Sequence, residues 1–131
     1  MKAALVALLE ASAAGTSVSN RIYPLIVPAD AALPHIALEF PGRTPDRQID
    51  GETDRNEWTF HVTVIASTLA AAETIGNQVD AALTDYNGTA SGVVFRFIRL
   101  IDDFNQIFES QDASEGHRYA RTLIFNAFTK G

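Results

Sequence analysis

The clearest pattern along the chain is an alternation of apolar and polar residues between Asn56 and Ser67. Every second position there is apolar, at Trp58, Phe60, Val62, Val64 and Ala66. Successive side chains of a strand point to opposite faces, so this spacing predicts a strand with one buried face. The period then changes: Thr68 can cap a helix that reaches to about Tyr86, with an apolar stripe at helical spacing.

The opening residues predict a helix from about Lys2 to Ala14, ended by Gly15 as its C-terminal cap. The apolar run from Ala3 to Leu9 behind Lys2 also has the outline of a secretory signal, but Glu10 interrupts it at once. The helix is therefore the favoured interpretation. No apolar stretch approaches the ~20 residues needed to cross a bilayer.

Four further strands are expected, at His35 to Phe40, Val93 to Ile101, about Gln106 to Ser110, and His117 to Thr129. Prolines at positions 24, 28 and 34 make the segment before the first of them an extended connector with at most short strands. The elements predict an α+β fold, a mostly antiparallel sheet of about four to five strands with two helices on one face. A chain of 131 residues is expected to form a single domain.

Residues 42–57 form the one long polar segment. Because strands flank it, it is either a long β-hairpin arm or a flexible loop, and structureless loops longer than ~12–15 residues tend to be functional. We expect this arm to contact a partner through its charged residues: Arg43, Asp46, Arg47, Asp50, Glu52, Asp54 and Arg55.

The segment from Val93 to Ile101 is apolar at both parities, with Val93, Phe95 and Phe97 on one face and Val94, Ile98 and Leu100 on the other. A strand that is apolar on both faces needs cover on both, and two helices cover only one, so the second face indicates another subunit. The candidate subunit interface consists of Val94, Arg96, Ile98, Arg99, Arg118 and Arg121. The arginines either pair with carboxylates across the sheet or contact the neighbouring subunit, and the pattern leaves both open.

The composition and the motifs give little indication of a catalytic or ligand-binding site. The net charge of −6 argues against a protein that wraps nucleic acid, and the absence of cysteine excludes disulfides, thiol nucleophiles and thiolate metal sites. The three histidines lack ligand spacing, and Asp102 and Asp103 should point to opposite faces of their strand. No phosphate-binding loop or nucleophile motif occurs. We therefore expect no catalytic residue, cofactor or metal, and a non-enzymatic protein.

Several stretches in order resemble the tail completion, or tail terminator, family of long-tailed bacteriophages and of phage-derived particles such as gene transfer agents. The opening signature is similar in Arg21-Ile22-Tyr23-Pro24 and Ala32-Leu33-Pro34-His35-Ile36. His61-Val62-Thr63-Val64, with the helix after it, resembles the family's central strand and helix. Glu115-Gly116-His117-Arg118-Tyr119 resembles its ending.

The resemblance implies a virion protein that forms a hexameric ring, caps the tail tube, stops its polymerisation and joins the tail to the head-side connector. Its partners would be copies of itself, the tail-tube protein and the connector or stopper, without a membrane. DNA would pass through the lumen without sequence-specific binding. Assembly would take place in the bacterial cytoplasm, and the protein would then lie at the tail–head junction.

Two other interpretations stay open. One is another head–tail joining component, a stopper or a tail-tube subunit, because these also use small sheets and long arms. The other is a small oligomeric enzyme or ligand-binding domain, which would need convergent polar residues around a pocket.

Overall fold

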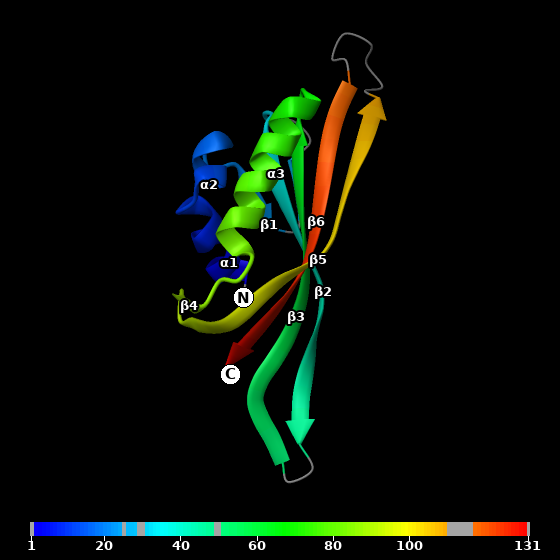
Figure 1. The fold of residues 1–131 in the computed structure, drawn as a ribbon. Helices are drawn as coiled ribbons and strands as arrows, with labels where there is room; N and C mark the ends of the chain where they lie inside the picture. Colours follow the sequence, from blue (N-terminus) through cyan, green and yellow to red (C-terminus); the bar gives the residue numbers. More distant parts are fainter. Residues whose placement is uncertain (1, 25, 29–30, 49–50, 110–116, 131) are drawn as a thin grey trace.

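The computed structural model describes residues 2–24, 26–28, 31–48, 51–109 and 117–130, with side chains for all of these except 42–48, 51–55, 107–109 and 117. Its centre is a twisted, curled sheet of six strands (Figure 1). The strands are β1 Ile22–Pro24, β2 His35–Gln48, β3 Gly51–Ala66, β4 Gly88–Ala90, β5 Val93–Glu109 and β6 His117–Lys130. Their order is β1-β2-β3-β6-β5-β4; β1 pairs in parallel with β2, and all other pairs are antiparallel.

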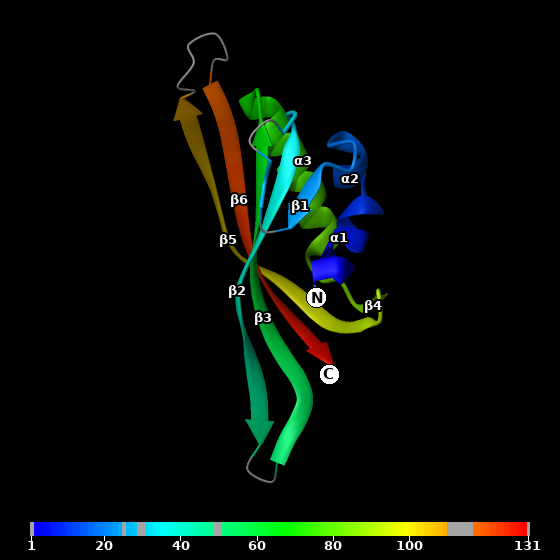
Figure 2. The same cartoon turned by 180° about the vertical axis from the view of Figure 1, so that it is seen from behind.

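All three helices cover the same face of this sheet (Figures 1 and 2). They are α1 Lys2–Glu10, α2 Ala13–Ser17 and α3 Leu69–Leu83. The α+β class and the one-sided helical cover were predicted, but the sheet has more strands and the cover one more helix than expected. The predicted opening helix is split because the chain turns at Ser12, whose Oγ donates to the Leu9 carbonyl at 2.6 Å. Gly15 consequently lies within α2 rather than ending a single helix.

The hydrophobic core lies between the helices and the covered face of the sheet. From β3 it receives Phe60, Val62 and Val64, which confirms the face predicted from the alternation. Phe60 stacks on Phe125 of β6, with ring centroids 5.3 Å apart, and both rings are fully buried. The helices add apolar side chains at helical spacing: Leu5, Leu9, Ile75, Val79 and Leu83.

The long helix α3 begins as predicted and ends earlier. Thr68 Oγ1 accepts a hydrogen bond from the Ala71 amide at 3.1 Å, which satisfies one of the free donors of the first turn. After Leu83 the chain leaves the helix, and the Asp85 amide donates to the Ile98 carbonyl of β5 at 2.8 Å. Beyond the expected helix end at Tyr86, Gly88 begins the short strand β4, which pairs with the start of β5.

Strand β5 corrects the predicted pattern of faces. It is one strand of 17 residues rather than two, and its pairing with β6 shifts between Phe95 and Phe97 and again between Leu100 and Asp102. Each extra residue moves the following side chains to the other face. Phe95 and Ile98 therefore share the buried face, whereas Phe97 is 40% exposed, so the prediction that Phe95 and Phe97 share a face was wrong.

Two hairpins extend beyond the core. In the β2–β3 hairpin, backbone pairing continues to Gln48 and Gly51, so residues 42–48 and 51–57 form the hairpin arm and not the flexible loop. The core side chains of β2 end at Leu38 and those of β5 at Ile98. β2 then continues past the helical layer, whereas β5 runs on alongside helix α3 (Figure 1). The β2–β3 and β5–β6 hairpins leave the centre of the sheet in opposite directions (Figure 1).

Candidate assembly surface

The face of the sheet that carries no helix has a polar ladder along its two central strands, β3 and β6. Thr59 Oγ1 donates to Asn126 Oδ1 at 3.0 Å, and Asn126 Nδ2 donates to Glu57 Oε1 at 2.8 Å. Four residues further along β3, beyond the His61–Ile124 pair, the hydroxyls of Thr63 and Thr122 lie 3.1 Å apart. These groups satisfy each other across the strands, so this part of the face is compatible with water.

Beside the ladder, β5 carries exposed apolar side chains. Val94, Phe97, Ile101 and Phe104 are between 39% and 51% exposed. Phe97 stacks on Phe128 with centroids 6.2 Å apart, and the Arg99 guanidinium lies 5.5 Å from the centre of the Phe128 ring. Aromatic residues and arginine are enriched at the centres of protein interfaces, so this part of the open face has the composition of a contact surface.

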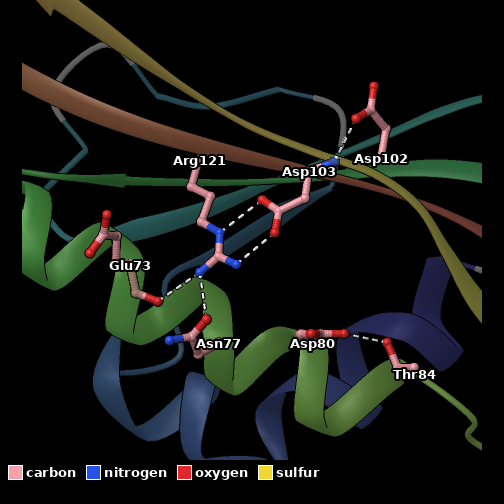
Figure 3. A network of polar contacts seen from close by, with 7 residues as sticks. All are labelled: Glu73, Asn77, Asp80, Thr84, Asp102, Asp103 and Arg121. Carbon is pink, nitrogen blue, oxygen red and sulfur yellow. Dashed lines mark hydrogen bonds and ion pairs between the residues drawn. The ribbon is translucent and has the colours of Figure 1, made fainter.

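Arg121 of β6 ties the sheet to helix α3 on the opposite, covered face (Figure 3). Its Nε and Nη2 donate to the two carboxylate oxygens of Asp103 at 2.9 and 2.7 Å. Its Nη1 donates to the Glu73 carbonyl and to Asn77 Oδ1, both at 2.8 Å. We call these four residues the Arg121 clamp. The two-pronged ion pair lowers the pKa of Asp103, and the same bonds raise the pKa of Arg121.

The clamp explains two features that were singled out in the sequence, the neighbouring acids Asp102 and Asp103, and Arg121. Asp102 and Asp103 point to opposite faces, as predicted: Asp103 faces Arg121, while Asp102 points away and accepts only the Asp103 amide at 2.8 Å (Figure 3). The sequence left two alternatives open for Arg121. The structure contains the first of them, a pairing with a carboxylate across the sheet. Sequence reasoning missed Asn77 and the carbonyl of Glu73 as partners, because they lie 44 and 48 residues from Arg121.

The structure separates the residues predicted for a subunit interface: Val94, Arg96, Ile98, Arg99, Arg118 and Arg121. Ile98 is completely buried in the core of its own chain, and Arg121 is held in the clamp, so neither side chain is available to a neighbour. Val94, Arg96 and Arg99 are exposed on β5, and Arg118 is partly buried on β6. For these four the interface stays a prediction.

The charged residues predicted to make contacts from the arm lie outside the described side chains: Arg43, Asp46, Arg47, Asp50, Glu52, Asp54 and Arg55. What is described there is the backbone pairing, which places Arg43 opposite Trp58 and Arg47 opposite Glu52. Where this arm leaves the core there is an apolar hollow of about 360 Å³, lined by Lys2, Ala3, Phe40 and Trp58.

His35 occupies a buried place at the start of β2. Its Nδ1 lies 3.1 Å from the Ala32 carbonyl, and its ring makes an edge contact with Tyr23, with centroids 5.6 Å apart. Among the described residues its Nε2 is the buried side-chain atom without a hydrogen-bond partner. Burial lowers the pKa of His35, and the positive charges of Arg118 and Arg21 lower it further. The hydrogen bond to the Ala32 carbonyl acts in the opposite direction, because it favours the protonated ring.

The lowered pKa of His35 predicts a pH-dependent stability. The unfolded chain, with a pKa near 6.5, binds this proton at a higher pH than the folded chain does. Stability is therefore complete above pH 6.5 and falls as the pH drops below it, by at most about 1.4 kcal/mol per pH unit. Urea denaturation of the wild type and of His35→Gln between pH 5 and 8 measures this. An unchanged slope in the variant would assign the effect to other groups.

Within the described parts of the chain, no group of histidine, aspartate and glutamate side chains is arranged to hold a metal ion. In the same residues, no helix combines the length and apolar character needed to cross a membrane.

A sheet covered on one side, an open face with exposed aromatic side chains, and two long hairpins are typical of a structural subunit that assembles with other proteins. The particular family follows from the sequence: residues 3–128 match the family model described as tail completion protein gp17. The chain belongs to this family. It is a structural protein of the phage tail type and not an enzyme, as predicted.

The solved structures that share the fold include the following two. A chain in the virion of a native gene transfer agent (GTA) particle is 19% identical, with a TM-score of 0.76 over 100% of this chain and 95% of that one. A second solved chain is 14% identical, with a TM-score of 0.52 over 97% of this chain and 95% of that one. No curated protein sequence matches this one.

Proposed function

We propose that this protein is a tail terminator, a ring of identical subunits that closes the finished tail tube and joins it to the head-side connector. The observation that carries the proposal is the pair of long hairpins that leave the central sheet in opposite directions (Figure 1). A subunit built in this way can contact a different partner at each end. A terminator needs this, because it meets the tube on one side and the connector on the other.

The lengths of the strands support this role. Strands β2, β3, β5 and β6 have 14, 16, 17 and 14 residues, whereas the average strand has about five to six. The core takes its side chains from the first part of β2 and of β5, from the last part of β3, and from most of β6. We assign the remaining length of β2, β3 and β5 to contacts with partners.

The mechanism is steric. One end of the ring matches the docking surface of the tube, and the other end lacks a copy of that surface, so polymerisation stops at one layer. The charged arm, residues 42–57, is our candidate for the contact with the tube or with the neighbouring subunit. Exposed Val94, Arg96 and Arg99, together with Arg118, belong to the proposed subunit interface. DNA would pass through the lumen of the ring.

Membership of the tail completion family and the likeness to a chain of a gene transfer agent virion support a place at the head–tail junction of a particle. By the same likeness, assembly would take place in the bacterial cytoplasm. The family model leaves the number of subunits open, and a hexamer is our proposal.

Native mass spectrometry and electron microscopy of the protein, alone and with its tail-tube protein, test the terminator role. We expect a closed ring, six subunits in mass, and a single ring at one end of each tube. Growth into tubes of unlimited length would instead identify a tube subunit. A monomer that never joins a tube end would refute the proposal.

The arm can be tested separately by replacing residues 45–56 with Asn-Gly. This two-residue turn follows Thr44 and precedes Glu57, which already face each other, so the hairpin closes in register. We expect the shortened protein to keep its thermal unfolding midpoint, because the core residues lie elsewhere, but to lose its binding to tube ends. Tube ends that are capped as well as by the wild type would exclude the arm from this contact.

A further inference from the structure

The two opposite edges of the sheet are only partly covered. On one side, β4 pairs with β5 only up to Phe95, so the rest of β5 forms the edge. On the other side, β1 pairs with β2 only at Ile36, Ala37 and Leu38, so β2 forms the edge beyond that point. Sheets present such edges to other chains unless something covers them.

From Val94 to Ile101, β5 carries exposed apolar side chains and two arginines, and the acids Asp102 and Asp103 follow. We define the β5 rim as the exposed side chains Val94, Arg96, Phe97, Arg99, Ile101 and Phe104. Arg99 contacts the ring of Phe128, and neither Arg96 nor Arg99 pairs with a carboxylate among the residues that the structure describes. Two arginines beside exposed aromatic rings call for a partner that brings both apolar surface and negative charge.

The opposite edge offers that combination. Ile26 is 81% exposed, and the side chain of Glu39 is 70% exposed, with only His61 Nδ1 near it at 3.8 Å. Both residues follow the last pair of the β1–β2 register, Pro24 with Leu38: Glu39 is the next residue on β2, and Ile26 comes two residues after the end of β1. We define Ile26 and Glu39 as the β2 rim.

Building on the proposed ring, we propose that the β5 rim of one subunit docks against the β2 rim of the next copy of this chain. Arg99 or Arg96 then meets Glu39, and Ile26 packs among the β5 apolar side chains. A closed ring requires a head-to-tail contact between two different surfaces, and the two edges of one sheet are such a pair. The partner is thus a second copy, selected by complementary charge and by exposed apolar side chains on both rims.

The docking uses side chains rather than a continuous strand ladder. On the β5 edge the Ile98 carbonyl already accepts from the Asp85 amide, and the Asp103 amide already donates to Asp102. On the β2 edge, Pro41 and Pro45 lack an amide hydrogen, and the pairing shifts register near both. Both edges are therefore poorly suited to unlimited strand addition, which agrees with a contact that closes instead of forming fibres.

Mixing two variants tests the head-to-tail contact directly. One variant, Phe97→Asp, has a damaged β5 rim; the other, Ile26→Asp, has a damaged β2 rim. We expect each alone to be a folded monomer, with its subunit contact weakened roughly 30-fold or more. An equimolar mixture should give a one-to-one heterodimer and nothing larger in native mass spectrometry, because each variant keeps one intact rim.

A charge exchange tests the pairing. Arg99→Glu should abolish the ring, and adding Glu39→Arg should restore it, both in solution and at tube ends. The matched control adds Glu10→Arg instead; Glu10 is an exposed acid on helix α1, and this reversal should restore nothing. Circular dichroism checks that every variant is folded.

The outcomes separate the two proposals. Rings that persist in the rim variants, or a mixture that stays monomeric, would overturn the rim contact while leaving the terminator role intact. Rim variants that keep intact rings but no longer bind tube ends would show that these side chains contact the tube protein instead. That result would likewise overturn the rim contact. A wild-type protein that forms a ring neither alone nor on tubes would refute the proposed function itself.

Discussion

Replacing Phe125 with alanine is expected to lower the free energy of unfolding by about 3–5 kcal/mol. The ring is completely buried and stacks on Phe60, between the sheet and the helices, so its removal leaves a cavity that the neighbouring strands cannot close. Urea denaturation followed by circular dichroism measures the loss. The dependence on urea concentration should stay the same, because the variant exposes the same surface on unfolding.

Phe97→Ala is the matched control on the other face of the sheet. Phe97 is 40% exposed, so its truncation is expected to change stability by less than about 1 kcal/mol. It should instead weaken assembly, since Phe97 belongs to the β5 rim. If Phe97→Ala unfolded the protein as readily as Phe125→Ala, the open face would be part of the core, and its assignment to a subunit contact would be wrong.

The regular elements could be predicted from the sequence because their periods are uninterrupted. The alternation that ends at Ala66 gave the buried face of β3 correctly, and Thr68 marked the start of α3 to within one residue. In both cases the period is uninterrupted, from Trp58 to Ala66 in β3 and along helix α3. Local sequence is sufficient under these conditions.

Strand β5 could not be predicted in the same way, because its faces depend on its pairing with β6. The extra residues near Arg96 and Ile101 arise from the register between two strands, and an apolar run shows no sign of them. The short strand β4 was missed, and β1 was expected only as one of the short strands that the connector could hold, for a related reason. Three residues are too few for a period, and what makes them strands is the edge of β2 or β5 to which they bind.

The Arg121 clamp was also beyond local sequence, since its partners come from β5 and from α3. One residue could have pointed to it. Gly76 lies within the apolar stripe of α3, where glycine is unfavourable unless something approaches closely. The structure supplies the reason: a Cβ atom at this position would lie 2.5 Å from Arg121 Cδ and 2.7 Å from its Nη1.

Arg121→Ala is expected to lower the free energy of unfolding by about 2 kcal/mol, because it removes four charged hydrogen bonds. The value stays below that of a fully buried pair, since the Asp103 side chain is 32% exposed and water can replace part of the lost interaction. Asp103→Asn keeps one acceptor for Arg121 and should cost less. If Asp103→Asn lowered the free energy of unfolding more than Arg121→Ala does, the clamp would not stabilise the fold mainly through the hydrogen bonds of Arg121.

The effect of Gly76→Ala on the free energy of unfolding should have opposite signs in two backgrounds, one with arginine and one with alanine at position 121. In the wild type the added methyl group must displace the guanidinium from its four hydrogen bonds, so we expect a loss of about 1–2 kcal/mol. In the Arg121→Ala background that conflict is absent, and the better helix propensity of alanine should stabilise the protein by up to about 1 kcal/mol. Thr74→Ala, an exposed substitution in the same helix, should have the same small effect in both backgrounds. If Gly76→Ala gave equal effects in the two backgrounds, the glycine would not be there to admit Arg121; the reversal would establish that helix α3 and strand β6 are fitted to each other at this point.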